Sequence, residues 1–136
     1  MSRQRRILIV DDEEPVLLAM TEYFTLRGFA VDGARDMRQA EMLFAANHYA
    51  IVITDLQLTA GNDRQGFDLI TYVRQQRPSV CVILLTAHGS PEVEVEAHRR
   101  GVSAFLHKPM SLSNVEHTVR SLLASRHDRP QREPRT

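Results

Sequence analysis

The sequence has only one cysteine, Cys81, and this shortage excludes several classes of protein. A lone cysteine cannot form the disulfide framework of a small secreted domain or a zinc site built from several thiolates. Because Cys81 lies inside the apolar run VCVILL, we interpret it as a small buried hydrophobic residue in a reducing compartment. The expected location is therefore the cytoplasm.

The sequence also lacks a net charge and a long hydrophobic run. Its 17 basic residues balance 17 acidic residues, so no overall field attracts nucleic acid or an anionic membrane. No segment approaches the length of a membrane span, and the apolar run after the basic start MSRQRR is too short for the core of a signal peptide. With 136 residues the chain is expected to form one domain that binds neither nucleic acid nor membrane.

Short apolar runs recur along the chain, at 7–10, 29–33, 50–54, 80–85 and 102–106. Segments of helical length separate these runs, and this alternation predicts βαβ units in a parallel sheet, an α/β fold. The runs that begin at residues 7, 50 and 80 are apolar throughout, as in strands covered on both faces, whereas the other two are mixed. We expect three central strands and two edge strands.

The segments between the runs carry apolar stripes at helical spacing. The stripe residues are Leu17, Met20 and Phe24, then Ala40, Leu43 and Phe44, then Ile70 and Val73, and finally Val115, Val119 and Leu122. Pro15, Pro91 and Pro109 stand at or just before expected helix starts, and Gly28 and Gly101 stand where helices should stop. Five strand–helix repeats are predicted.

The segment PEVEVEAH, residues 91–98, carries conflicting signals. Its apolar and acidic residues alternate as in a strand, but Ser90 and Pro91 favour a helix start and Gly101 a helix stop. We predict a helix with a poor apolar stripe and weak anchoring.

The composition changes near the C-terminus. After Ala124 the chain is polar and rich in arginine and proline. We therefore place the folded domain at residues 1–125, and a solvated tail or the start of a linker at residues 126–136.

Polar side chains follow four of the five runs. They are Asp11 and Asp12 after the first, Asp55 after the third, Thr86 after the fourth and Lys108 after the fifth. Ligands of an open parallel sheet bind beyond the carboxyl ends of its strands, so these side chains should converge. Each alone has an ordinary explanation as a turn former, a cap or a solvated charge, but together they favour a functional site.

Three clustered carboxylates need compensation, because two of them about 4 Å apart repel by roughly 4 kcal/mol at an effective dielectric near 20. All-oxygen ligands favour a hard divalent cation, Mg²⁺ above all. With the ion in place, one carboxylate can act as a nucleophile toward a phosphoryl group, while Lys108 and Thr86 supply a charge and a hydroxyl donor. Glu13 and Glu14 are expected only to favour the positive end of the first helix.

The six histidines do not form a metal-ligand pattern. They are His48, His88, His98, His107, His117 and His127, and we interpret them as surface residues, with a reservation for His88 because of its place beside the site.

The motifs ILIVDDE, IVITDL, ILLTAHG and FLHKP occur in this order, and with them residues 5–125 resemble the receiver domain of two-component response regulators. The resemblance implies a flavodoxin-like (βα)5 sandwich with strand order 2-1-3-4-5. It also implies that Asp11, Asp12, Asp55 and the backbone carbonyl of Gln57 hold Mg²⁺, with Mn²⁺ as a possible substitute. Asp55 would accept a phosphoryl group from a sensor histidine kinase or a phosphotransfer protein in a phosphorelay.

The same resemblance implies a switch. Thr86 would bond the phosphoryl group and move inward, Lys108 would pair with it, and the Lys108–Pro109 peptide would be cis. Phe105 takes the place of the family's aromatic switch residue and has no hydroxyl, so partners would read it through shape and apolar contact. The output surface would be the fourth helix, fifth strand and fifth helix, with a phosphorylation-dependent dimer as one outcome. Such a domain is not an enzyme in the usual sense, although it assists its own phosphorylation and dephosphorylation.

The chain departs from the family after its acceptor. Leu58 and Thr59 replace the usual Met-Pro, and Gly66 comes eleven positions after Asp55, so the loop 58–65 is longer by about three residues. Gln57 and His88 occupy places that tune hydrolysis of the aspartyl phosphate in the family. We expect His88 to make that lifetime depend on pH.

Three other functions compete with this interpretation. A dehalogenase-type phosphatase needs Asp-x-Asp, which Asp55-Leu56-Gln57 does not supply. A flavodoxin-like nucleotide binder needs a Gly/Ser/Thr-rich phosphate cradle where this chain has carboxylates. A phosphorylation-independent interaction module remains the alternative, and the sequence identifies neither the output partner nor whether the chain acts as a single domain.

Overall fold

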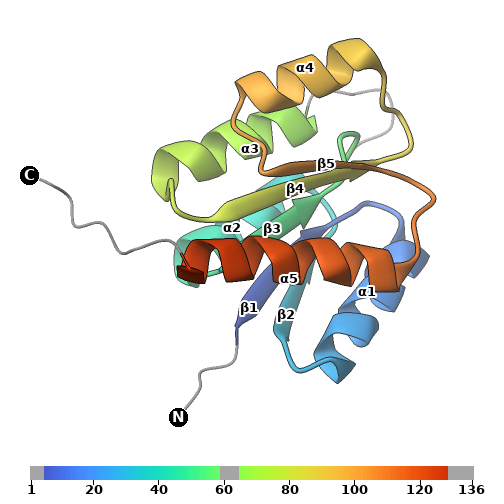
Figure 1. Ribbon diagram of the computed structural model, residues 1–136, viewed down its shortest axis with the longest axis vertical. Coiled ribbons are helices and arrows are strands. Elements are labelled where there is room, and N and C mark those ends of the chain that lie inside the picture. Colours follow the sequence, from blue (N-terminus) through green and yellow to red (C-terminus); the bar gives the residue numbers. More distant parts are fainter. Residues whose placement is uncertain (1–4, 59–64, 129–136) are drawn as a thin grey trace, which may run out of the picture.

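The computed structural model describes residues 5–58 and 65–128 (Figure 1). Within them, five strands alternate with five helices, as predicted. The elements are β1 (Arg6–Val10), α1 (Glu14–Leu26), β2 (Ala30–Ala34), α2 (Met37–Ala46), β3 (Ile51–Thr54), α3 (Gln65–Gln76), β4 (Cys81–Thr86), α4 (Pro91–Arg99), β5 (Ala104–His107) and α5 (Leu112–Asp128).

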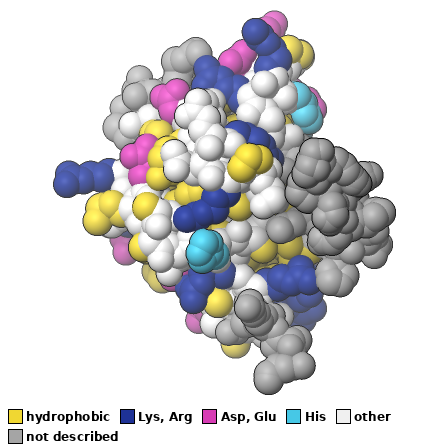
Figure 2. Space-filling model, turned by 90° about the vertical axis from the view of Figure 1, so that its left-hand side faces the viewer, with side chains coloured by type: hydrophobic (Ala, Val, Ile, Leu, Met, Phe, Trp, Pro, Cys, Tyr) yellow, Lys and Arg dark blue, Asp and Glu magenta, His cyan; other side chains and the backbone are white. Residues whose placement is uncertain are grey.

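The strands form one parallel sheet in the order β2-β1-β3-β4-β5. Helices α1 and α5 cover one face, and α2, α3 and α4 cover the other (Figure 1). The three-layer architecture, the strand order and the assignment of β2 and β5 as edge strands are therefore confirmed. On the face that Figure 2 shows, basic and acidic side chains are intermixed, in agreement with the balanced composition.

The apolar strands are explained by burial on both sides. Leu8 and Val10 of β1 belong to the core between the sheet and α2, α3 and α4. Ile7 and Ile9 point to the opposite core, beneath α1 and α5. All four are at most 1% exposed, so neither face of the strand tolerates a polar residue.

Four strands begin later than the predicted runs. The starts of β3 and β4 differ by one residue, whereas β2 and β5 start later because the apolar residue after a helix-terminating glycine belongs to the helix cap. Gly28 and Gly101 have φ angles of +101° and +98°. The N–H of Phe29 then bonds the Phe24 carbonyl, and that of Val102 bonds the Ala97 carbonyl, both at 3.1 Å. This is the Schellman pattern, so β2 starts at Ala30 rather than residue 29 and β5 at Ala104 rather than residue 102.

Helix α4 forms as predicted. Ser90 accepts a hydrogen bond from the Val93 N–H at 3.2 Å, and Pro91 lies in the first turn. Ala97 is its buried residue, which agrees with the poor apolar stripe.

Helix α5 differs from expectation at its end. It continues to Asp128, so the polar segment that begins at residue 126 starts inside a helix. Among the α5 residues whose burial is described, Leu123 is the last buried one, and Leu122 is only partly buried. Residues 59–64 of the long loop and 129–136 of the predicted tail lie outside the described residues. None of the described helices is long and apolar enough to cross a membrane.

Candidate functional site

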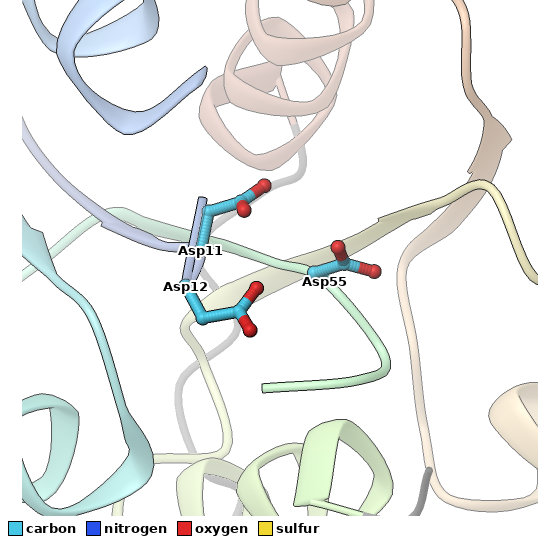
Figure 3. Close-up of side chains that lie close together, drawn as sticks. All are labelled: Asp11, Asp12 and Asp55. Atoms are coloured by element: carbon cyan, nitrogen blue, oxygen red, sulfur yellow. The ribbon is translucent and has the colours of Figure 1, made fainter. Parts of the chain in front are cut away.

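Three carboxylates gather at the carboxyl edge of the sheet. Asp11 and Asp12 follow β1, and Asp55 follows the neighbouring strand β3 (Figure 3). One carboxylate oxygen from each lies within 4.8 Å of the others. Asp11 is 3% and Asp55 is 5% exposed, whereas Asp12 is partly exposed at the rim. The convergence predicted from the sequence is confirmed for these three residues.

Backbone N–H groups orient the two buried carboxylates. The Glu13 N–H donates to Asp11 Oδ1 at 2.9 Å, and the Leu56 N–H donates to Asp55 Oδ1 at 2.7 Å. Glu13 is also the residue that caps α1, so the chain turns into its first helix directly beside the carboxylates. Each acid therefore has one oxygen held by the backbone and the other directed elsewhere.

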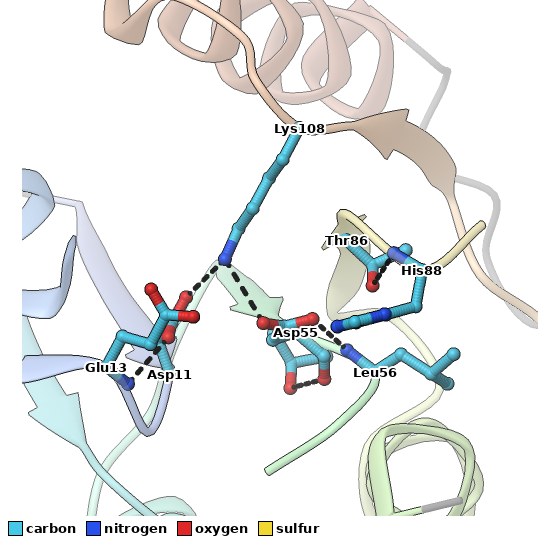
Figure 4. A network of polar contacts seen from close by, with 8 residues as sticks. Asp11, Glu13, Asp55, Leu56, Thr86, His88 and Lys108 are labelled. Carbon is cyan, nitrogen blue, oxygen red and sulfur yellow. Dashed lines mark hydrogen bonds and ion pairs between the residues drawn. The ribbon is translucent and has the colours of Figure 1, made fainter. Parts of the chain in front are cut away.

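Lys108 bridges these remaining oxygens. Its Nζ lies 2.9 Å from Asp11 Oδ2 and 3.1 Å from Asp55 Oδ2 (Figure 4). Burial opposes the charge of Lys108, but its hydrogen bond to Asp11 and the charges of Asp55 and Asp11 outweigh this and raise its pKa. The Lys108–Pro109 peptide is cis, as the resemblance implied, and the Lys108 N–H bonds the Thr86 carbonyl at 2.9 Å.

Lys108 is the only lysine among the 17 basic residues, a signal that the motif analysis overlooked. The other cationic side chains are arginines, whose planar guanidinium groups suit bidentate pairs. A compact ammonium can instead fit between two carboxylates that approach from different strands. The single lysine of the sequence thus lies between Asp11 and Asp55, where a compact positive charge can contact both carboxylates.

The charge of the cluster suits a hard divalent cation. Three carboxylates and one ammonium leave two negative charges in a small, partly buried space. The donor atoms are oxygens, and Asp12 at the rim leaves the cluster accessible to solvent. Mg²⁺ prefers such ligands and keeps part of its water shell, so the residues present fit this ion.

Thr86 ends β4 beside the cluster. It is 0% exposed, and its Oγ1 accepts a hydrogen bond from the His88 N–H at 3.0 Å. The hydroxyl thereby holds the start of the loop between β4 and α4. His88 is exposed, and its side chain extends in Figure 4 from that loop in the direction of Asp55. His88 is thus a surface residue, as expected for all the histidines, and a role at the site stays a prediction.

Phe105 and His107 cover the same loop from the edge strand. Their rings pack edge to face with centroids 5.1 Å apart. A Cβ on Gly89 would lie 3.0 Å from the His107 ring and 3.2 Å from the Phe105 ring. Sequence reasoning missed His107, although side chains two apart on a strand share a face.

Gly66 also approaches the acceptor, and its role was missed. It lies in the first turn of α3, and its N–H bonds the Leu56 carbonyl at 2.8 Å. A Cβ on Gly66 would lie 2.5 Å from Leu56 Cα and 2.6 Å from the Asp55 carbonyl oxygen, closer than packing allows. Gln57, one residue beyond Leu56, is partly buried. A glycine inside a helical segment is the sequence signal for such a close approach.

The family model of the response regulator receiver domain matches residues 7–120, a range that contains the carboxylates, Thr86 and Lys108. The chain belongs to the response regulator receiver domain family.

Curated relatives of this receiver domain are longer proteins. The chain is 30% identical over 119 residues to the photosynthetic apparatus regulatory protein RegA of Cereibacter sphaeroides, covering 88% of this chain and 63% of RegA. It is 31% identical over 136 residues to the response regulator protein PilR of Pseudomonas aeruginosa, covering 98% of this chain and 29% of PilR. The chain thus spans less than two thirds of either relative.

Solved structures of receiver domains have the same fold. The signal receiver domain of an HD domain-containing protein from Pseudomonas fluorescens matches with a TM-score of 0.84 at 28% identity, covering 92% of this chain and 98% of that one. The receiver domain dimer of NtrC4, solved in its beryllofluoride-activated form, matches with a TM-score of 0.79 at 27% identity, covering 89% and 98%. The flavodoxin-like (βα)5 fold is therefore confirmed.

Proposed function

We propose that this receiver domain accepts a phosphoryl group on Asp55, with Mg²⁺ bound, from a phosphohistidine of a sensor histidine kinase or phosphotransfer protein in the cytoplasm. The observation that carries the proposal is the setting of Asp55. Its buried carboxylate is fixed by the Leu56 N–H and by Lys108, beside two further carboxylates. A carboxylate so placed is oriented as a nucleophile.

Asp11, Asp12, Asp55 and the backbone carbonyl of Gln57 would hold the ion, with Mn²⁺ as a substitute. A cation held there would neutralise the excess charge of the cluster and would screen the phosphoryl oxygens from the attacking carboxylate. The carboxylate oxygens that meet within 4.8 Å support this assignment.

The transfer forms one bond and breaks one. An Asp55 carboxylate oxygen bonds to phosphorus, the phosphorus–nitrogen bond of the donor breaks, and its electron pair returns to the imidazole. Lys108 then exchanges its contact with Asp55 Oδ2 for a phosphoryl oxygen, keeping its 2.9 Å contact with Asp11. The protein thereby assists its own phosphorylation, and later dephosphorylation, without turning over a separate substrate.

The switch would start at Thr86. To donate to the phosphoryl group its hydroxyl must turn toward Asp55, and the bond that it accepts from the His88 N–H is then disturbed. The loop between β4 and α4 can shift, and the Phe105 ring, half-buried against His107, can turn inward. The surface of α4, β5 and α5 would thereby control an output partner or domain.

Three further assignments complete the proposal. Gln57 and His88 would tune the lifetime of the phosphoryl group from positions beside the acceptor. The switch would lead to a phosphorylation-dependent dimer, and the beryllofluoride-activated NtrC4 receiver domain dimer supports this assignment. The folded domain would end with α5, near the previously assigned boundary at residue 125, and a tail or linker would follow.

Intact mass after incubation with acetyl phosphate tests the proposal. We expect one added phosphoryl group in Mg²⁺, and none in EDTA or in Asp55→Asn. A folded protein that shows no adduct, and that also binds no beryllofluoride in Mg²⁺, would favour the alternative, an interaction module that acts without phosphorylation.

A further inference from the structure

Helix α4 is attached to the molecule mainly by its C-terminal half. Ala97 is 0% exposed, whereas Val95 is 60% exposed and Pro91 is exposed. After the last turn, the Gly101 carbonyl accepts a hydrogen bond from Arg74 Nε of α3 at 2.7 Å. In the N-terminal half, the partly buried Val93 packs against the same core, so the helix is held at both ends but more firmly at its C-terminal end.

Arg100, the residue that caps α4, ties this fixed end to α3. Its Nε donates to Glu96 Oε2 at 2.7 Å, and its Nη1 donates to Thr71 Oγ1 at 3.2 Å. The same nitrogen lies 3.6 Å from Asp68 Oδ1, and the guanidinium carbon lies 5.3 Å from the centroid of the Phe67 ring. The Arg100 side chain is only 22% and the Glu96 side chain 28% exposed, so this pair is better shielded than a surface ion pair, whereas Asp68 is 58% exposed.

In α3, the residues that contact Arg100 come just after Gly66, the residue that touches the backbone of the phosphoacceptor Asp55. They are Phe67, Asp68 and Thr71. Gly66 packs on the backbone of Asp55 and Leu56 with no room for a methyl group. Phe67 is the next residue and is 4% exposed, in the same core as Leu56 and Ala97. A displacement of the Asp55 backbone must therefore displace the first turn of α3 as well.

We propose that Arg100 couples α4 to the phosphoacceptor through α3, as a second connection beside that of Thr86 and Phe105. The proposal rests on the proposed function, because it concerns how the phosphoryl group on Asp55 is sensed. Arg100 touches no reacting atom and acts as a positioning residue for α4.

Thermodynamic linkage gives this proposal a measurable consequence. If the state of Asp55 alters the contacts of Arg100, then loss of those contacts must alter the affinity of the site for a phosphoryl group. In the described arrangement Arg100 holds α4 against α3 while Thr86 accepts the His88 N–H and Phe105 contacts His107. Removing the Arg100 side chain frees α4 and favours the alternative arrangement, in which Phe105 is turned inward.

The test is a titration of the full chain in Mg²⁺ with beryllofluoride, which stands in for the phosphoryl group, followed by amide NMR. Arg100→Ala is compared with Arg99→Ala, a matched control on the adjacent residue. Arg99 is 74% exposed and pairs with the same Glu96 at 3.2 Å. Thr71→Val, which removes the hydroxyl acceptor on α3 and leaves α4 unchanged, is the second variant.

We expect Arg100→Ala to bind beryllofluoride at least about threefold more tightly than the wild type, and Thr71→Val to shift in the same direction. Arg99→Ala should match the wild type. Amide hydrogen exchange over residues 91–99 should accelerate in Arg100→Ala before any ligand is added.

Equal affinities in the wild type, Arg100→Ala and Thr71→Val would overturn the coupling, and weaker binding by Arg100→Ala would overturn the direction assigned to it. If Arg100→Ala does not fold, Thr71→Val decides the question. A wild-type protein that binds no beryllofluoride in Mg²⁺ would contradict the proposed function itself, and the coupling with it.

Discussion

At the scale of single residues, the site consists of carboxylates that carry excess negative charge and whose orientation is fixed by hydrogen bonds. In Asp11 and in Asp55, one carboxylate oxygen accepts a hydrogen bond from a backbone N–H and the other accepts one from Lys108. The identity of these residues was predictable from the sequence, because parallel strands bring their carboxyl ends to one edge. Their hydrogen-bond partners were not, since a backbone N–H leaves no mark in the sequence.

The shape of the Lys108 ammonium is expected to matter as much as its charge. Lys108→Arg keeps the charge, but a planar guanidinium cannot take the position between two carboxylates that the compact ammonium occupies. We expect phosphorylation of Asp55 by acetyl phosphate to slow at least about tenfold in both Lys108→Arg and Lys108→Met. Rates of adduct formation by mass measure this. A near-normal rate in Lys108→Arg alone would show that only charge is required.

A third buried acid, Glu116 of α5, has a structural role. It is 6% exposed and accepts hydrogen bonds from the Tyr23 hydroxyl at 2.6 Å, from Arg120 Nε at 2.8 Å and from Arg27 Nε at 3.1 Å. The bond from Tyr23 and those from the two arginines lower the pKa of Glu116 from 4.5 to about 2. The ionised carboxylate therefore joins α5 to α1.

Because its pKa is lowered on folding, Glu116 stabilises the native state above pH 4.5, and this stabilisation is lost as the pH falls from 4.5 toward 2. We expect Glu116→Gln to reduce the free energy of unfolding by about 1–3 kcal/mol at pH 7. Urea denaturation from pH 7 to pH 3 should show the difference from wild type shrinking with acid. Glu22→Gln, at an exposed position of α1, is the control. A difference that stays constant with pH would contradict the assignment.

At the scale of elements, glycines decide where helices end and how closely they approach the sheet. At Gly28 and Gly101 the predicted starts of β2 and β5 were too early. In the sequence, an apolar residue that belongs to a helix cap resembles the first residue of a strand. The type and order of the elements were predictable from their periodicity. Their ends depend on hydrogen bonds that periodicity does not report.

Gly66 gives a prediction for helix α3. In a free helix an alanine would be favoured by about 1 kcal/mol, but here its Cβ would meet backbone atoms of Asp55 and Leu56 at 2.5–2.8 Å. We expect Gly66→Ala to lower the free energy of unfolding by about 2 kcal/mol or more and to slow phosphorylation of Asp55. Thermal or urea unfolding measures the first effect and adduct mass the second.

Gly33→Ala on β2 is the matched control. The nearest atoms to its Cβ would be those of the flexible Leu17 side chain, at 3.1–3.5 Å, so a smaller loss of stability is expected. Equal losses in the two variants would mean that α3 moves easily away from the acceptor, which would also weaken the coupling assigned to Arg100.

At the scale of the whole molecule, the topology places β1, β3 and β4 side by side and so assembles the site from segments far apart in the sequence. The family motifs allowed the fold, the three carboxylates, Thr86 and Lys108 to be predicted together. The contacts of Arg100 with α3, of Glu116 with α1 and of His107 with Gly89 were not predicted, because each joins elements whose relative placement is set only by packing.

We expect Asp55, rather than a neighbouring carboxylate, to carry the phosphoryl group. Borohydride reduction after phosphorylation converts an aspartyl phosphate to homoserine, and peptide mass spectrometry then locates the modified residue. We expect homoserine at residue 55 only, in Mg²⁺ and not in EDTA, with Asp11 and Asp12 unchanged. Reduction at Asp11 or Asp12, or an adduct that forms without a divalent cation, would contradict this assignment.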